Sequence, residues 1–226
     1  MPGRVLAIAG RPFPFRLISI LDNASLRLYC LFREAHPMKA LTSDEVLKVL
    51  KAVSDNPRDL AMILLAFRHG MRASEVCGLE LRDLDLKNGE ITIRRLKGSL
   101  KTTQPLADLQ GQPLLSEKRV LRAWLAERGN HPSKYVFTSQ KSGRVHRSQF
   151  YRVFSAAAEK AGLPQDKRHP HVLKHSLAVT LVEANVNLAT VRVALGHKSI
   201  ASTAVYAVPS DDSAGKATLN ALASTF

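Results

Sequence analysis

Four side chains in the last quarter of this chain have types and spacings that could do chemistry together. His171 and Lys174 stand three residues apart, so one turn of a helix would carry both toward the same cleft. His197 follows Leu195-Gly196, and Tyr206 lies nine residues beyond it. Imidazole and ammonium groups stabilise negative charge, and a tyrosine hydroxyl is a nucleophile once a base takes its proton. Singly, each is better explained as a solvated or packing residue, so the signal lies in their order and spacing.

Two further candidates lie earlier in the chain. Arg72 follows Gly70-Met71 at the predicted start of a helix, with Glu75 one turn further on. By itself this pair is typical of a solvated i, i+3 ion pair. Lys97 stands beside Gly98 at the tip of a predicted β-hairpin, where an exposed lysine is the usual finding.

A cluster of histidines raises the question of a metal site. His169, His171 and His175 lie close together, but no cysteine or carboxylate completes a good zinc ligand set with them. We therefore expect neither a metal nor a cofactor.

The composition favours a folded, basic protein that binds a polyanion. Hydrophobic residues make up 45% of the 226 residues, enough for a buried core, and the net charge is +14. Nucleic acid is a better partner for such a charge than an anionic membrane, because no amphipathic lysine-rich anchor helix is evident. No stretch reaches the ~18 apolar residues of a membrane span. Cys30 and Cys77 have no framework spacing, so we expect reduced thiols in a cytoplasmic protein.

The elements that must position these residues are mostly helices. Thr42 and Glu45 form a capping box that begins one helix, and Asn56-Pro57 begins a second, which Gly70 ends. Further helices are predicted from Arg72 to about Leu79, after Ser116 as a cap, and from Ser148 onward with breaks at Gly162-Leu163-Pro164, Asn185, Gly196 and Pro209.

Between these helices the spacing of the hydrophobic residues changes from helical to alternating, which indicates a small sheet. Asn88-Gly89 is a hairpin signal, and Ile91 and Ile93 alternate with polar residues. Residues 102–106 are predicted as the returning strand and 135–137 as another short strand. The expected fold class is mainly α with a small antiparallel β-sheet, that is, α+β.

The order of these motifs resembles the tyrosine recombinase family, also called phage integrases. The family pattern is an arginine in Gly-x-Arg-x-x-Glu, a lysine on a β-hairpin, His-x-x-Arg, a histidine or tryptophan, and then a tyrosine. The matching segments are Gly70 to Glu75, Arg95 to Gly98, His171 to Ser176, Leu195 to Ile200, and Tyr206. The resemblance covers about residues 41–210 and is closest to the compact fimbrial phase-variation recombinases.

The resemblance implies a role for each matching residue. Tyr206 would be the nucleophile that forms a 3′-phosphotyrosyl bond. The cations and imidazoles would stabilise the phosphate in the transition state, His171 would also accept the tyrosine proton, and Lys97 would protonate the leaving 5′ oxygen. The residues concerned are Tyr206, Arg72, Lys97, His171, Lys174 and His197, with Glu75 in support. The bond energy is conserved, so the reaction needs neither ATP nor metal.

Lys174 departs from the family pattern, which has arginine there. Lysine keeps the charge but loses the planar, bidentate fork. The loss of one charge-assisted hydrogen bond costs roughly 1–3 kcal/mol, so we expect a reaction about ten- to a hundredfold slower rather than an inert protein.

The resemblance also implies an organisation and partners. We expect an N-terminal extension over residues 1–40, without the separate DNA-clamping domain of larger members, a catalytic domain over 41–210 and a C-terminal tail or helix over 211–226. Double-stranded DNA is the expected substrate, bound by a homotetramer on two sites, with accessory DNA-bending proteins. We expect a bacterial or phage protein that acts in the bacterial cytoplasm. Its gene would be carried by a mobile element.

Three alternatives remain open on the sequence alone. Residues 186–205 have the pattern of a helix-turn-helix, which would suit a non-catalytic DNA-binding regulator. A type IB topoisomerase uses similar chemistry without site specificity. A decayed recombinase would keep the fold and lose the reaction, as the lysine at position 174 and the short N-terminal region allow.

Overall fold

The computed structural model describes residues 39–95, 101–139 and 143–206. The chain divides into two units, Met1–Met38 and Lys39–Phe226, and all described residues belong to the second. The helices are α2 (Ser43–Ala52), α3 (Pro57–Arg68), α4 (Ala73–Cys77), α5 (Glu117–Arg128), α6 (Arg147–Lys160), α7 (His171–Glu183), α8 (Leu188–Leu195) and α9 (Ala201–Ala204), with short 3₁₀ turns at Leu81–Asp83 and Gln165–Lys167. The predicted fold class, α+β with few strands, is confirmed.

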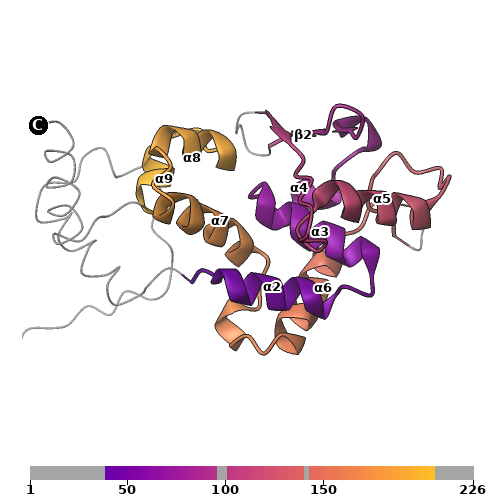
Figure 1. Ribbon diagram of the computed structural model, residues 1–226, viewed down its shortest axis with the longest axis horizontal. Coiled ribbons are helices and arrows are strands. Elements are labelled where there is room, and N and C mark those ends of the chain that lie inside the picture. Colours follow the sequence, from indigo (N-terminus) through magenta and orange to yellow (C-terminus); the bar gives the residue numbers. More distant parts are fainter. Residues whose placement is uncertain (1–38, 96–100, 140–142, 207–226) are drawn as a thin grey trace, which may run out of the picture. The chain divides into compact units, whose positions relative to one another are not determined.

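Helix α3 is the centre of the core. Every residue from Leu60 to Ala66 is buried, as expected for a helix covered on all sides. It packs against α5, α7 and α4 (Figure 1). A fully buried leucine or isoleucine contributes roughly 1.5–3 kcal/mol, so this helix gives the site a rigid support.

The sheet has three antiparallel strands in the order β1-β2-β3. Strand β1 (Leu84–Asp85) turns into β2 (Glu90–Ile93) through Asn88-Gly89, where Gly89 has a φ of +73°. Strand β3 (Thr102–Pro105) returns with Ile93 opposite Thr102. Both predicted hairpins are therefore confirmed, although the tip of the second, with Lys97, lies outside the described residues.

A second, smaller cluster fixes the helices that follow α7. Leu177 and Ala178 of α7 pack with Val191 and Leu195 of α8, and Tyr206 lies against them. This contact joins the end of the chain's described part to the segment that carries His171 and Lys174.

The local signals for helix starts were mostly correct. Thr42 and Glu45 form the capping box, with hydrogen bonds of 3.2 and 2.8 Å, and Asn56 caps α3. Ser116 precedes α5 as predicted, but its hydroxyl donates to Asp108 at 3.2 Å and makes no cap bond.

The strand predicted at residues 135–137 was wrong. Tyr135 makes one isolated antiparallel bridge, to Glu80, and no strand forms there. Val136 and Phe137 are completely buried against α5, which accounts for the apolar residue types at these positions. Trp124 of α5 donates from its indole to the Val136 carbonyl at 2.9 Å. Burial, rather than strand pairing, explains this short apolar run.

Two expectations from composition concern cysteines and membranes. Cys77 is buried and free, whereas Cys30 lies outside the described residues. Within ranges 39–95, 101–139 and 143–206, no helix has the length and apolar character needed to cross a membrane.

Candidate active site

A tight turn after α3 places Arg72 at the start of α4. Gly70 has a φ of +55°, a left-handed conformation that favours glycine. A Cβ atom at this position would lie 2.8 Å from Leu195 Cδ2 and 3.7 Å from Lys174 Cγ. The glycine thus lets the backbone before Arg72 approach α7 and α8 closely.

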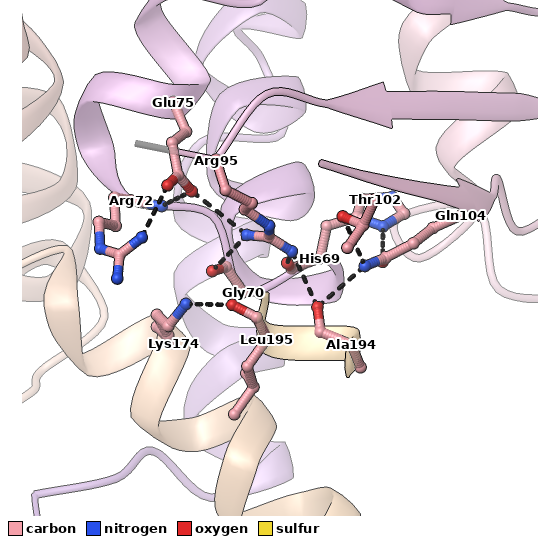
Figure 2. Close-up of polar contacts among 10 residues, drawn as sticks. All are labelled: His69, Gly70, Arg72, Glu75, Arg95, Thr102, Gln104, Lys174, Ala194 and Leu195. Atoms are coloured by element: carbon pink, nitrogen blue, oxygen red, sulfur yellow. Dashed lines mark hydrogen bonds and ion pairs between the residues drawn. The ribbon is translucent and has the colours of Figure 1, made fainter. Parts of the chain in front are cut away.

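Glu75 orients Arg72. The carboxylate is buried and accepts from the Arg72 backbone N–H at 2.9 Å and from its Nη1 at 2.8 Å. The Arg72 side chain stays 30% exposed, so part of it remains accessible to solvent. The expected i, i+3 surface pair therefore joins a buried carboxylate to a partly exposed cation. Figure 2 shows the contacts between the two residues.

Lys174 is buried next to this arginine. It is 3% exposed, and its Nζ donates to the Leu195 carbonyl at 2.6 Å. Burial, with the positive charges of Arg95 and Arg72, lowers the pKa of Lys174 to about 7. A lysine in this state gains a proton readily when an anion arrives.

The two predicted histidines share the same electrostatic environment. Burial lowers the pKa of His171, and the charges of Lys174, His169 and Arg72 add to the effect. Burial also lowers the pKa of His197 to about 4, with contributions from Lys174 and Arg72. Arg72 contributes to the lowered pKa of His171, Lys174 and His197, so these four predicted residues lie close enough to interact electrostatically.

A helix end positions His197. Helix α8 ends at Leu195, and Gly196 adopts a left-handed φ of +64°. The His197 N–H then donates to the Arg192 carbonyl at 2.9 Å, and its Nδ1 lies 3.0 Å from Thr203 Oγ1. These two contacts fix both the backbone and the ring plane.

Tyr206 contacts a histidine that the motifs had not singled out for this purpose. Its hydroxyl lies 2.8 Å from His175 Nδ1, and the His175 ring meets the His171 ring edge-on at 4.6 Å. Burial raises the pKa of Tyr206 to about 12 and is the main cause that lowers the pKa of His175 to about 4. Near neutral pH the imidazole is uncharged, so in the tautomer that carries its hydrogen on Nε2 the Nδ1 atom accepts the hydrogen bond from the tyrosine hydroxyl. The available signal was spacing, since His175 follows His171 by four residues on one helix face.

Arg95 is the second residue that motif reasoning did not single out. Its side chain has no exposed surface and pairs with Glu75 at 3.2 Å. The sequence signal was an alternation: Ile91 and Ile93 face the core, so a charged residue two positions further on also faces inward.

Two predicted features have a more limited outcome. Lys97 lies outside the described residues. In the part of the chain that the structure describes, no group of three histidine, cysteine or carboxylate side chains is placed to hold a metal ion.

Comparison with known proteins identifies the family. Residues 39–212 match the Phage integrase family. Type 1 fimbriae regulatory protein FimB of Escherichia coli (strain K12) is 38% identical over 172 residues, 74% of this chain and 82% of FimB. The XerA recombinase crystal structure has the same fold, with a TM-score of 0.67 and 24% identity over 87% of this chain and 74% of that one. A lambda integrase tetramer bound to a Holliday junction matches at TM-score 0.56 and 25% identity, over 71% of this chain and 47% of that chain.

The chain belongs to the phage integrase family, the site-specific tyrosine recombinases. The predicted family, its likeness to the fimbrial recombinases and the class of enzyme are thereby confirmed. His197 lies between α8 and α9 and Tyr206 lies two residues after α9, so the segment with the helix-turn-helix pattern is the one that holds two of the predicted site residues.

Proposed function

We propose that this chain cuts and rejoins DNA strands at specific sites through a covalent bond between Tyr206 and a 3′ phosphate. The observation that supports this most directly is the Tyr206 hydroxyl bound to uncharged His175, beside a cluster of cations and imidazoles. The cluster consists of Arg72, His171, Lys174 and His197.

The cluster is suited to a phosphodiester. In the reaction, the Tyr206 oxygen forms a bond to phosphorus, and the bond from phosphorus to the 5′ oxygen breaks. Negative charge grows on the non-bridging oxygens during this step, and preorganised cations stabilise it most effectively away from water. The partly exposed Arg72 side chain would contact such an anion, and Lys174 would become fully charged as the phosphate approaches.

The proton of the nucleophile goes first to His175. The hydroxyl pKa of about 12 makes unassisted ionisation unfavourable, and His175 Nδ1 is within hydrogen-bond reach at 2.8 Å. His171, the base that the resemblance implied, contacts the ring of His175 and stabilises the phosphate in this scheme. Lys97 supplies the proton that the leaving 5′ oxygen needs, as the resemblance implies.

The partners follow from the same proposal. The lambda integrase relative is a tetramer on a DNA junction, and the net charge of +14 suits a DNA surface. We therefore propose a homotetramer that joins two double-stranded sites in the cytoplasm, with accessory DNA-bending proteins at some sites. Residues 41–210 would form the catalytic unit, and residues 1–40 and 211–226 would flank it.

A covalent trapping assay tests this proposal. Purified protein is mixed with nicked fragments of the DNA that flanks its gene, and adducts that survive SDS but not protease are counted. Wild type should form them, Tyr206→Phe should form none, and His175→Leu should form them at least about tenfold more slowly because the proton acceptor is lost.

The outcomes separate the alternatives. Adducts in the Tyr206→Phe variant would contradict the assigned nucleophile, and wild-type rates in His175→Leu would contradict the assigned base. DNA binding without adducts would indicate a regulator or a decayed recombinase. Relaxation of supercoiled plasmid irrespective of sequence would indicate topoisomerase activity instead.

A further inference from the structure

Arg95, two residues beyond the end of β2, is a buried cation with an unusual number of backbone partners. Its guanidinium donates to the carbonyls of His69 at 2.8 Å, Gly70 at 3.1 Å and Ala194 at 2.8 Å. It also donates to Glu75 Oε2 at 3.2 Å (Figure 2). An unpaired buried charge is strongly destabilising, so this set of acceptors is what permits Arg95 to remain inside.

These acceptors belong to two separate parts of the site. His69 and Gly70 form the turn that leads into Arg72, whereas Ala194 lies in the last turn of α8, three residues before His197. The Arg95 side chain therefore joins the backbone that precedes Arg72 to the backbone that precedes His197.

The C-terminal end of α8 is held by further donors. Gln104 of β3 donates its amide to the same Ala194 carbonyl at 2.9 Å, and Lys174 donates to the next carbonyl, that of Leu195. Carbonyls at a helix C-terminus lack partners within the helix and carry partial negative charge, so cationic and amide donors stabilise them. The position of this helix end thus depends on Arg95, Gln104 and Lys174 together.

Close packing strengthens the connection to His197. A Cβ atom on Gly196 would lie 2.6 Å from Arg95 Nε and 2.8 Å from its Cγ and Cδ atoms. The turn that directs His197 therefore lies directly against the Arg95 side chain, and a change in one moves the other.

We propose that Arg95 is a positioning residue for strand cleavage. It holds the turn before Arg72 and the turn before His197 at the relative position in which the Arg72 and His197 side chains can contact the same phosphate. The inference rests on the proposed function. Arg95 itself does not touch DNA, because its side chain has no exposed surface. Lysine cannot replace it, since one ammonium group does not reach four acceptors arranged around a planar fork.

The test measures the rate of adduct formation at saturating DNA. The substrate is the nicked duplex that the trapping assay identifies. Arg95→Lys should slow the wild-type reaction about ten- to a hundredfold, the effect expected of a displacement of catalytic groups by about 1 Å. Arg94→Lys is the matched control, because Arg94 is the neighbouring arginine, is 45% exposed and pairs with Asp83 away from the site. That variant should change the rate by less than about threefold.

A second substrate distinguishes positioning from a general loss of structure. A methylphosphonate at the scissile position replaces one non-bridging oxygen by methyl and removes the charge that Arg72 and His197 stabilise. The rate ratio between wild type and Arg95→Lys should then shrink toward one. Equal slowing on both substrates, or no slowing on either, would overturn the positioning role.

A milder variant covers the case in which Arg95→Lys does not fold, as judged by its thermal unfolding. Gln104→Met removes one donor from the Ala194 carbonyl and should show the same pattern at smaller amplitude. A folded Gln104→Met with wild-type rates on both substrates would contradict the proposal. A wild type that forms no adduct would instead contradict the proposed function.

Discussion

Lys174 makes the charge of the site depend on pH. Its pKa of about 7 means that the ammonium group is only partly charged near neutral pH in the absence of DNA. A phosphate anion favours the charged form, so DNA binding should draw in a proton. Arginine at this position would stay charged throughout, because its pKa lies above 12.

This difference predicts distinct pH profiles for wild type and Lys174→Arg. The charged form of Lys174 is the useful one, so wild-type cleavage should decline as pH rises above neutrality and the proton is lost. Lys174→Arg should lack this decline up to about pH 9 and should react as fast as wild type or up to about a hundredfold faster. The measurement is the rate of adduct formation between pH 6 and 9, for both proteins at DNA concentrations well below saturation, where the pH dependence reports the protonation of the DNA-free protein. Identical profiles, or complete loss of cleavage in Lys174→Arg, would refute the assigned role.

At the scale of elements, local sequence signals predicted most of the framework. The capping box of Thr42 and Glu45, the Asn88-Gly89 turn and the glycine that ends α3 each depend on a few adjacent residues. Such capping and turn signals can be recognised in the sequence before the fold is known. The wrong strand at residues 135–137 had no such signal and depended on an apolar run alone, which burial under α5 also produces.

The contacts that assemble the site were harder to predict, because they join elements distant in sequence. The hydrogen bond from Arg95 to Ala194 spans 99 residues, and the one between His175 and Tyr206 spans 31. Motif order supplied Arg72, His171, Lys174 and His197 through family resemblance, but no local pattern specifies which carbonyl a buried guanidinium will bind. A charged residue at an inward-facing position was the one hint, and it indicated burial without naming a partner.

At the scale of the whole molecule, the concentration of positive charge in the site lowers the stability of the folded protein. Arg72, Arg95 and Lys174 lie close enough to influence one another, and Glu75 is the carboxylate that pairs with both arginines. The excess of positive charge prepares the site for phosphate but disfavours protonation of the groups around it. Functional sites commonly carry such a cost in stability.

The histidines of the site predict how stability changes with pH. His175 and His197 each have a pKa of about 4 in the folded protein, against an ordinary value of 6.5. Between these values the unfolded chain binds more protons than the folded one, so the free energy of unfolding rises with pH. Acidification from pH 7 to 5 should therefore lower that free energy, well before most carboxylates titrate. Lys174, whose pKa falls from 10.5 to about 7, extends the same trend above neutrality.

Urea unfolding at pH 5, 6 and 7 measures this effect. A double variant, His175→Gln with His197→Gln, removes both groups and should lose most of the pH dependence in that range, even if it is less stable overall at pH 7. His146→Gln is a suitable control, because His146 lies on the exposed N-cap of α6 and is not part of the site; its dependence on pH should match that of wild type. A wild type whose stability is constant or greater at pH 5 would show that these two imidazoles are not held uncharged in the folded protein. The neutral acceptor proposed for the Tyr206 proton would then be missing.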